Sequence, residues 1–245
     1  MFRPSDLPDG IILLITDELA APADFLLHRT LATLLKERQS PHALILSVSE
    51  GITRWRALAS KSNVNLQQHL DAGSLEFVDV LSEVHPPAAG GGGNLTTNTS
   101  FRVLVDRVQA YLDRAQGGSP LIILDDITTL EWIGFSAVEI TRFSRALRSV
   151  CLKANATLLI RHHIVTPNEP DDLFRHLLQI SNYHLEVRPL SSGRSGEVSG
   201  EISLHPGFSA PSKTIKLINR STATQYRLTD VGPVFFAKGT SGGVL

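Results

Sequence analysis

The residues best suited to chemistry are two consecutive aspartates, Asp125 and Asp126, which follow the apolar run Leu-Ile-Ile-Leu at 121–124. An apolar strand that ends in an acid is the element with which nucleotide hydrolases hold Mg²⁺ through water. An aspartate that leaves a strand also commonly caps the turn or helix after it. Whether the pair can serve a nucleotide therefore depends on a phosphate-binding loop elsewhere in the chain.

The stretch that should hold the phosphates is residues 17–24, after the first apolar run, and it reads Asp-Glu-Leu-Ala-Ala-Pro-Ala-Asp. A phosphate loop needs glycines for close backbone approach, free backbone N–H groups and a lysine. This stretch has no glycine and no lysine, Pro22 removes one N–H donor, and three carboxylates repel a triphosphate. We therefore favour the capping role for the aspartate pair, and the sequence predicts a pseudo-ATPase.

Other catalytic or metal-binding arrangements have still less support. No Gly-x-Ser-x-Gly motif of serine hydrolases lies on an expected strand-to-helix turn, and Ser195 lies in a stretch rich in Ser and Gly. His162 and His163 are neighbours on a predicted strand, so they point to opposite faces and do not suit a metal site. We expect no catalytic, cofactor-binding or metal-binding residue in this chain.

The elements that must position these residues alternate between strand and helix. Continuous apolar runs, which are typical of strands covered on both faces, occur at 11–16, 43–48, 75–81, 121–125 and 157–161. Apolar residues at helical spacing lie between them, at 27–35, 101–112 and 138–151. This alternation predicts an α/β fold with a mostly parallel sheet flanked by helices.

The pattern changes after residue 183, where strands follow one another with little helix between them. The expected strands are 183–187, 200–204, 214–218, 225–228 and 234–237, and we expect them to extend the sheet as antiparallel C-terminal strands. Two segments rich in Gly, Pro or Ser, 84–99 and 191–199, are predicted to be mobile. We interpret residues 1–245 as a single domain.

A basic region near the C-terminus is the best candidate for nucleic-acid contact. No acid lies between Glu201 and Asp230, and cations with nearby aromatic rings can contact RNA phosphates and stack on bases. The alternative is a solvated sheet edge whose lysines prevent strand-to-strand aggregation. Together with the residues at the end of the 157–161 strand, the RNA-binding candidates are Arg161, His162, His163, Arg194, Lys213, Lys216, Arg220, Tyr226 and Arg227.

Two further sets of charges are candidates for protein interfaces. Arg142, Arg145 and Arg148 recur every three residues and form a basic stripe on a predicted helix. Asp17, Glu18 and Asp24 are expected in an exposed loop, where acids can pair with a neighbouring subunit. Trp55 and Trp132 are either core or interface anchors, and the sequence leaves that choice open.

Bulk composition restricts the class of protein. Hydrophobic residues make up 42% of the 245 residues and charged residues only 19%, which favours a protein with faces covered by partners. Lys and Arg number 23 against 24 Asp and Glu, so any contact with nucleic acid must be local. A single cysteine, Cys151, suits a reducing compartment, and the apolar run at 11–15 follows acids rather than a basic signal-peptide region.

The C-terminal residues resemble a known family. Residues 233–245 read Pro-Val-Phe-Phe-Ala-Lys-Gly-Thr-Ser-Gly-Gly-Val-Leu, which is similar to the Phe-Phe-Ala-Lys-Gly ending of Elongator complex subunit six. The strand at 121–126, the following Thr-Thr-Leu at 128–130 and Gly-Phe-Ser-Ala-Val at 134–138 also resemble that family. The similarity is dense in the middle and at the end of the chain, and weak over the first 100 residues.

The resemblance implies a RecA-like fold that lacks ATPase motifs. It implies assembly with Elongator subunits four and five into a heterohexameric ring, with the catalytic Elongator subunits as further partners. That ring binds tRNA, hydrolyses ATP to regulate tRNA release, and supports modification of the wobble uridine at carbon 5. ATP is then expected at partner subunits rather than as a cofactor of this chain, the protein is expected in the cytoplasm and also the nucleus, and no membrane is involved.

Two other functions remain open at this stage. The chain could be a nucleotide-binding ATPase that uses Asp125 or Asp126 with a degenerate phosphate loop. It could also be a pure scaffold that never contacts RNA. A further role, supply of an arginine to a neighbour's nucleotide site, has three candidates in Arg142, Arg145 and Arg148, with nothing to single one out.

Overall fold

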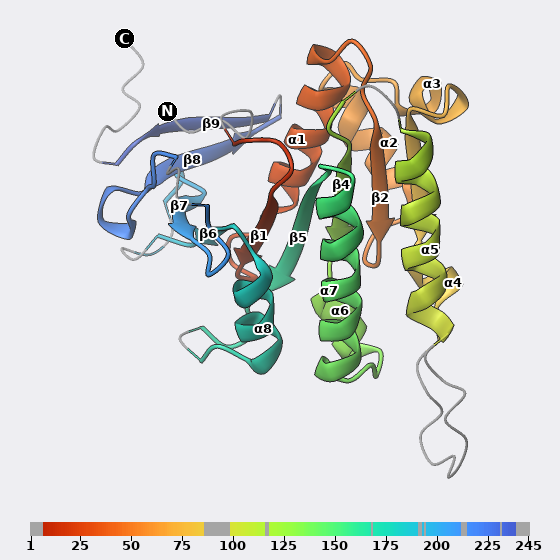
Figure 1. Cartoon of the computed structure of the whole chain (residues 1–245). Helices are drawn as coiled ribbons and strands as arrows, with labels where there is room; N and C mark the ends of the chain where they lie inside the picture. The colour runs from red at the N-terminus through yellow and green to blue at the C-terminus, as the bar shows by residue number, and fades with distance from the viewer. Residues whose placement is uncertain are drawn as a thin grey trace.

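A computed structural model of the chain describes residues 7–85, 99–115, 118–167, 169–190, 193, 195–211, 215–230 and 232–238. Nine strands form one sheet in the order β3-β2-β4-β5-β1-β6-β7-β8-β9 (Figure 1). Their bounds are β1 Ile12–Asp17, β2 Ala43–Ser47, β3 Leu75–Asp79, β4 Leu121–Asp125, β5 Thr157–His163, β6 Tyr183–Arg188, β7 Gly200–Pro206, β8 Thr224–Thr229 and β9 Gly232–Ala237.

The sheet has a parallel part and an antiparallel part. Strands β3, β2, β4, β5, β1 and β6 pair in parallel, and β6, β7, β8 and β9 pair antiparallel. The predicted α/β architecture with antiparallel C-terminal strands is therefore confirmed. One detail differs, because β6 was expected among the antiparallel strands and instead runs parallel to β1. The reason is helix α8 (Asp172–Ile180), which the sequence pattern did not reveal. It connects the carboxyl end of β5 to the amino end of β6, so that β6 runs in the same direction as β5 and β1.

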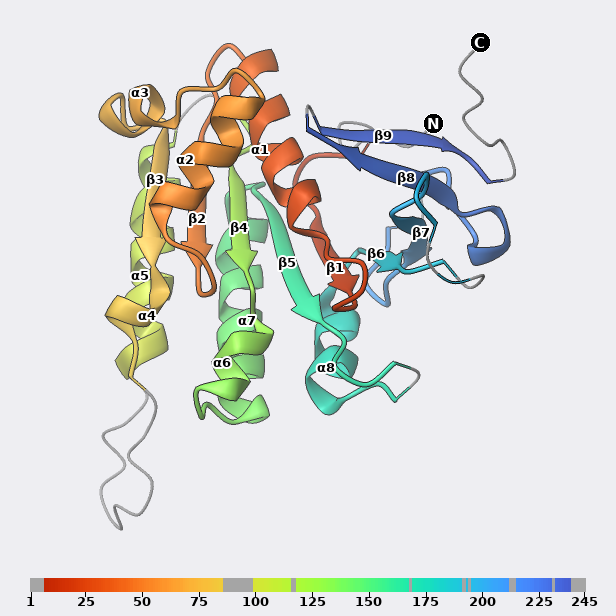
Figure 2. The same cartoon turned by 180° about the vertical axis from the view of Figure 1, so that it is seen from behind.

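Helices cover both faces of the parallel strands. Figure 1 shows α5, α7 and α8 in front of the sheet, and Figure 2 shows α1 and α2 on the other side. No helix within the described ranges is both long enough and apolar enough to cross a membrane. The remaining helix bounds are α1 Asp24–Glu37, α2 Ile52–Lys61, α3 Leu66–Asp71, α4 Val80–Glu83, α5 Thr99–Arg114, α6 Thr128–Trp132, α7 Ala137–Lys153 and the 3₁₀ turn η2 Arg220–Thr222.

Two hydrophobic cores lie on opposite faces of the sheet, and β1 contributes to both. Leu13 and Ile15 pack with α1 and α2, whereas Ile12 and Leu14 pack with α5, α7 and α8. All six residues of β1 are buried. The continuous apolar run therefore reflects burial on both faces, as the sequence pattern predicted.

One expected strand is shorter in the structure, another does not form among the described residues, and the two segments predicted to be mobile are only partly described. Strand β3 ends at Asp79, where helix α4 begins, so the strand expected at 75–81 is shorter. No strand corresponds to 214–218 among the described residues, where Ile218 forms only an isolated bridge with Leu204. Of the two segments predicted to be mobile, residues 86–98 and residues 191, 192 and 194 lie outside the described residues.

The two tryptophans occupy opposite environments. Trp55 is fully buried in the core under α1, where its Nε1 donates to Ser47 Oγ at 3.4 Å and its ring lies 4.2 Å from that of His28. Trp132, at the end of α6, is 63% exposed. Trp55 is thus a core residue, and Trp132 is a surface residue.

This contrast gives a matched pair of variants. Trp55→Ala should lower the free energy of unfolding by about 3–5 kcal/mol, because it removes a large buried side chain and leaves a cavity. Trp132→Ala should change it by no more than about 0.5 kcal/mol. Urea denaturation followed by circular dichroism measures both, and equal destabilisation by the two variants would contradict the placement of these residues.

Candidate functional site

Three neighbouring strands end in charged residues at the same edge of the sheet. Strand β5 lies between β1 and β4, and all three run parallel. Asp17 ends β1, Asp125 ends β4, and Arg161 lies near the end of β5. Because the carboxyl ends of parallel strands meet at one edge, this is the place where α/β proteins usually bind ligands.

Arg161 bridges the two aspartates. Its guanidinium contacts Asp17 Oδ2 at 2.9 and 3.0 Å through two nitrogens, and its Nη1 donates to Asp125 Oδ1 at 3.1 Å. The Arg161 side chain is 8% exposed, Asp125 2% and Asp17 0%. The central strand thus carries a buried cation that pairs with an acid from each neighbouring strand.

Burial is the largest influence on the pKa values of Asp125 and Arg161. It raises the pKa of Asp125 to about 6, although Arg161 acts in the opposite direction. Burial also disfavours the charge of Arg161, but Asp17 and Asp125 outweigh this effect and raise the pKa of the guanidinium. The arginine therefore remains charged, and its charge depends on the two acids.

Asp17 also organises the turn that follows β1. Its Oδ2 accepts the backbone N–H of Ala23 at 2.6 Å, and its Oδ1 bonds His163 Nδ1. This overturns the expectation that Asp17 lies in an exposed loop, because it is the last residue of β1 and its carboxylate holds the turn from inside. Glu18 is partly buried and pairs with Arg188 at 3.5 Å, and Asp24 begins helix α1.

The capping role that the sequence favoured for the aspartate pair is found for Asp126 alone, because Asp125 binds Arg161. Asp126 Oδ1 accepts the backbone N–H of Thr128 at 2.9 Å, and its Oδ2 accepts Thr129 Oγ1 at 3.1 Å. The side chain is buried, and both of its oxygens are used at the entry to α6. The carboxylates of Asp17, Asp125 and Asp126 are therefore all engaged by donors of the chain itself.

The two histidines at the end of β5 point to different partners, as their alternation on a strand predicts. His162 is fully buried, with Nδ1 2.9 Å from Thr128 Oγ1 and Nε2 3.1 Å from Asp171 Oδ2. His163 is partly buried, and its bond to Asp17 raises its pKa. Both imidazoles serve the internal hydrogen-bond network of this edge.

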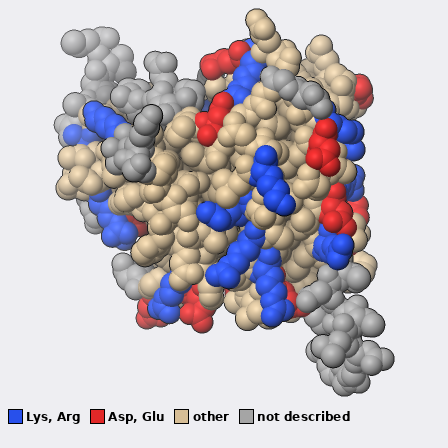
Figure 3. Space-filling view, in the orientation of Figure 1, with Lys and Arg blue, Asp and Glu red and all other residues tan. Residues whose placement is uncertain are grey.

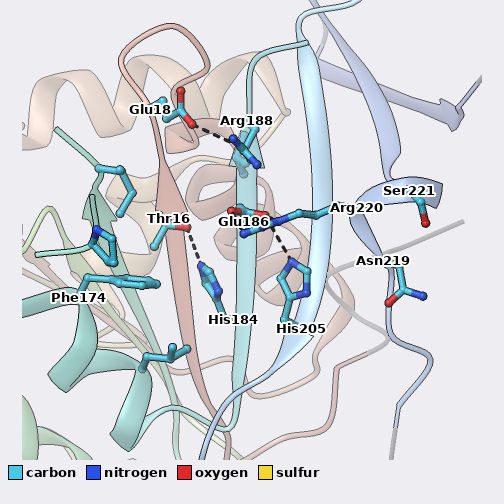
Figure 4. A pocket seen from close by; sticks show the side chains of 14 residues that line it. Thr16, Glu18, Phe174, His184, Glu186, Arg188, His205, Asn219, Arg220 and Ser221 are labelled. Carbon is cyan, nitrogen blue, oxygen red and sulfur yellow. Dashed lines mark hydrogen bonds and ion pairs between the residues drawn. The ribbon is translucent and has the colours of Figure 1, made fainter. Parts of the chain in front are cut away.

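A second feature is a pocket of about 830 Å³ between β1, β6, β7, α8 and the η2 turn (Figure 4). Its apolar wall includes Phe174 and Leu178 of α8. His184 and Glu186 of β6 face it, and His205 of β7 lies directly opposite His184 in the strand register. Figure 4 shows Arg220 reaching across β7 toward Glu186.

Polar side chains of this pocket satisfy one another. Arg220 donates to both oxygens of Glu186 at 2.7 Å, and His205 Nε2 lies 3.4 Å from the same carboxylate. These bonds with Arg220 lower the pKa of Glu186 although burial opposes them. His184 is buried and bonds Thr16 Oγ1 at 2.7 Å, and burial lowers its pKa to about 4. The pocket therefore presents the neutral imidazole of His184, an aromatic ring and an exposed guanidinium edge.

The predicted RNA-binding residues do not form one site. Arg161, His162 and Tyr226 are buried and offer an RNA almost no surface. Arg194 and Lys213 lie outside the described residues. The side chains that remain accessible are His163, Lys216, Arg220 and Arg227. Arg220 pairs with Glu186 and Arg227 with Glu197, whereas Lys216 contacts no carboxylate within the described ranges.

The predicted basic stripe lies on the outer side of α7. Arg142 and Arg145 are exposed and contact no carboxylate among the described residues, and Arg148 donates to the Ile180 carbonyl at 3.0 Å. Figure 3 shows Lys and Arg gathered over α7 at the centre of this face. The spacing of these arginines thus correctly indicated a shared, solvent-facing side of a helix.

Sequence reasoning missed the pocket residues Phe174, His184, Glu186 and His205. Residues 183–188 read Tyr-His-Leu-Glu-Val-Arg, and this alternation does indicate a strand with one polar face. It does not say what that face meets, because the pairing register of β6 with β7 and the position of α8 are set by tertiary packing.

A family model and individual relatives of this chain point to the same protein family. The model of the family described as Elongation complex protein 6 matches residues 2–230. Elongator complex protein 6 of Xenopus laevis is 27% identical over 237 residues, which cover 90% of this chain and 88% of the relative. The proteins of that name from Mus musculus and Homo sapiens are 26% and 25% identical, and each alignment covers 99% of this chain and 96% of the relative.

The bridge made by Arg161 can be tested by removing the cation. Arg161→Met should lower the free energy of unfolding by about 3–5 kcal/mol, because Asp17 and Asp125 would remain buried without their counter-charge. Adding Asp17→Asn and Asp125→Asn to this variant should restore much of the loss. The exposed Arg142→Met serves as the control, and urea denaturation is the measurement. A single variant as stable as the control would contradict the bridge.

The burial of His184 predicts a pH dependence. Its pKa is about 4 in the folded chain against an ordinary value of 6.5, so its contribution to stability is complete above pH 6.5 and is lost as the pH falls toward about 4. On going from about pH 7 to about pH 4.5, wild type should lose roughly 2–3 kcal/mol more than His184→Gln. Denaturation curves at both pH values measure this, and parallel losses would be the contrary result.

Proposed function

Because this chain belongs to the Elongation complex protein 6 family, we propose that it is a non-catalytic subunit of the Elongator complex that supports tRNA binding and release for modification of the wobble uridine at carbon 5. Family membership supports a place in the Elongator complex, with other Elongator subunits as partners. The tRNA-related role is the further step, and it rests on the family resemblance together with the surface charges.

The observation that carries the non-catalytic role is the engagement of Arg161 by Asp17 and Asp125. A nucleotide hydrolase needs its acid free to hold Mg²⁺ and its first turn free to bind phosphate. Here a cation of the chain holds Asp125, and Asp17 accepts an N–H at the start of α1. Opening this arrangement would leave buried charges uncompensated, which supports a scaffold or binding role over hydrolysis.

The proposed assembly is a RecA-like heterohexameric ring with Elongator subunits four and five, placed beside the catalytic Elongator subunits. ATP is bound at partner subunits in this proposal, and the chain itself carries no cofactor. The protein works in the cytoplasm and also reaches the nucleus. A mostly parallel sheet with helices on both faces is compatible with such a ring subunit.

The proposed tRNA contact uses three separate accessible cations, Lys216 before the η2 turn, Arg220 in that turn and Arg227 of β8. The aromatic and imidazole pocket of Figure 4 opens beside Arg220, whereas Lys216 borders another pocket. Cations that approach phosphates displace counterions, so this contact should depend on salt. If Arg220 released Glu186 and bound a phosphate instead, its side chain would also leave the pocket, which could then accept a base.

Nucleotide binding provides the first test. Calorimetry of the purified full chain with ATP and Mg²⁺ should give no heat of binding at micromolar concentrations of the chain. The alternative, an ATPase with a degenerate phosphate loop, predicts micromolar affinity that Asp125→Ala abolishes. That result would overturn the non-catalytic role while leaving membership of the complex unaffected.

Titration of tRNA provides the second test, on the chain assembled with its co-expressed Elongator partners. The triple variant Lys216→Ala, Arg220→Ala, Arg227→Ala should weaken tRNA binding and reduce the salt slope of log K by about one for each lost phosphate contact. A matched control of equal charge, Lys36→Ala with Arg56→Ala and Lys61→Ala, lies on exposed positions of α1 and α2 and should bind like wild type. Equal binding by both triples, with no tRNA crosslink to this chain, would favour a pure scaffold.

A further inference from the structure

A second cavity, of about 550 Å³, opens at the carboxyl edge of the sheet on the other side of Glu18 from the pocket of Figure 4. We call it the edge cleft. The segments after β1, β2 and β5 and the end of α6, which follows β4, border it. These segments are far apart in sequence, so the cleft exists only because four parallel strands end at the same edge.

Exposed apolar side chains form the rim of the edge cleft. Leu19 is 89% exposed, Trp132 63% and Val165 62%, and all three line the cleft. Among the other large apolar side chains in the described ranges, Phe208 is 79% exposed and Val138 57%, and neither lines the cleft. Apolar side chains gathered at one opening, rather than scattered singly, are typical of a surface that another protein covers.

Acids line the interior of the same cleft, at Glu18, Glu50 and Asp126. With the ion-pair partners Asp17, Asp24 and Asp125 added, six carboxylates stand against the three guanidinium groups of Arg54, Arg161 and Arg188. His163 adds at most one more positive charge through its bond with Asp17. The edge cleft therefore keeps an excess of negative charge.

Glu50 shows that this negative charge is incompletely satisfied. Its Oε1 bonds Arg54 Nε at 2.6 Å, but its Oε2 is buried without a hydrogen-bond partner within the described part of the chain. Burial raises the pKa of this carboxyl, although Arg54 opposes the shift. A buried acceptor without a donor is costly, so this carboxylate is less completely compensated than the acids that bind Arg161.

We propose that the edge cleft binds a segment of another Elongator subunit in which an arginine or lysine is flanked by apolar side chains. This deepens the proposed function, on which it rests, by giving the chain a defined protein-docking site. The apolar neighbours would cover Leu19 and Val165, and the cation would lie against the acids and the face of Trp132. A nucleotide or tRNA phosphate is disfavoured because the carboxylates repel it.

The position of the partner can be found by photo-crosslinking in the assembled complex. The full chain carrying a benzophenone amino acid in place of Trp132 is co-expressed with the other Elongator subunits and irradiated. We expect a crosslink to one of these subunits, next to an arginine or lysine with apolar neighbours. The same probe in place of Phe208 is the control, because that residue is 79% exposed and outside the cleft.

Affinity variants test the two chemical parts of the cleft separately. Trp132→Ala should weaken capture of the crosslinked subunit on the order of ten-fold, as expected for an aromatic interface anchor. Glu18→Gln with Glu50→Gln should weaken it several-fold at low salt and less at high salt. Phe208→Ala should leave capture unchanged. Thermal melting of each variant shows whether any loss comes from unfolding.

The outcomes separate this inference from the proposed function. Wild type could assemble and bind tRNA while the Trp132 probe gives no crosslink to another subunit and the variants leave capture unchanged. In that case the edge cleft proposal is wrong and the proposed function stands. A crosslink from the Trp132 position to tRNA or to a second copy of this chain would also overturn it. Failure of wild type to assemble with any Elongator subunit would overturn both.

Discussion

The structure depends on one buried ionic bridge, in which Arg161 of β5 pairs with both Asp17 of β1 and Asp125 of β4. Each of these charges is buried, and an unpaired buried charge is costly. Loss of any one of the three residues would therefore leave a buried charge without its partner. The bridge ties three adjacent strands together at the edge where α/β proteins usually bind ligands. It also uses the groups with which that edge would otherwise hold a metal ion or a phosphate.

The same bridge shapes the surfaces on either side of it. Asp17 holds the turn after β1, and this turn places Glu18 in the wall between the pocket of Figure 4 and the edge cleft. The first pocket contains imidazoles and an exposed arginine, whereas the edge cleft contains acids under an apolar rim. The two surfaces therefore differ in chemistry, because the acids of the first pocket pair with its arginines whereas the edge cleft has more carboxylates than guanidinium groups.

Membership of the Elongation complex protein 6 family gives these surfaces a context. A subunit of a larger complex does not need a catalytic site of its own, but it does need surfaces that select its neighbours. The exposed side of α7, with Arg142 and Arg145 free of carboxylates in the described residues, adds a further charged face. The low overall content of charged residues makes this concentration on a few faces more informative than the net charge of the chain.

The sequence by itself determined the α/β architecture, the bounds of all nine described strands to within two residues, and the capping role that Asp126 has, because local hydrophobic period and local hydrogen bonding control these features. It also indicated that residues 17–24 do not suit phosphate. Only the tertiary structure decided that Asp17 is buried and that Arg161 is buried and pairs within the chain. It also decided that Trp55 is buried whereas Trp132 is exposed. Each of these depends on which strands lie side by side and on what covers them, and contacts between residues more than 100 positions apart leave no periodic signal in the chain.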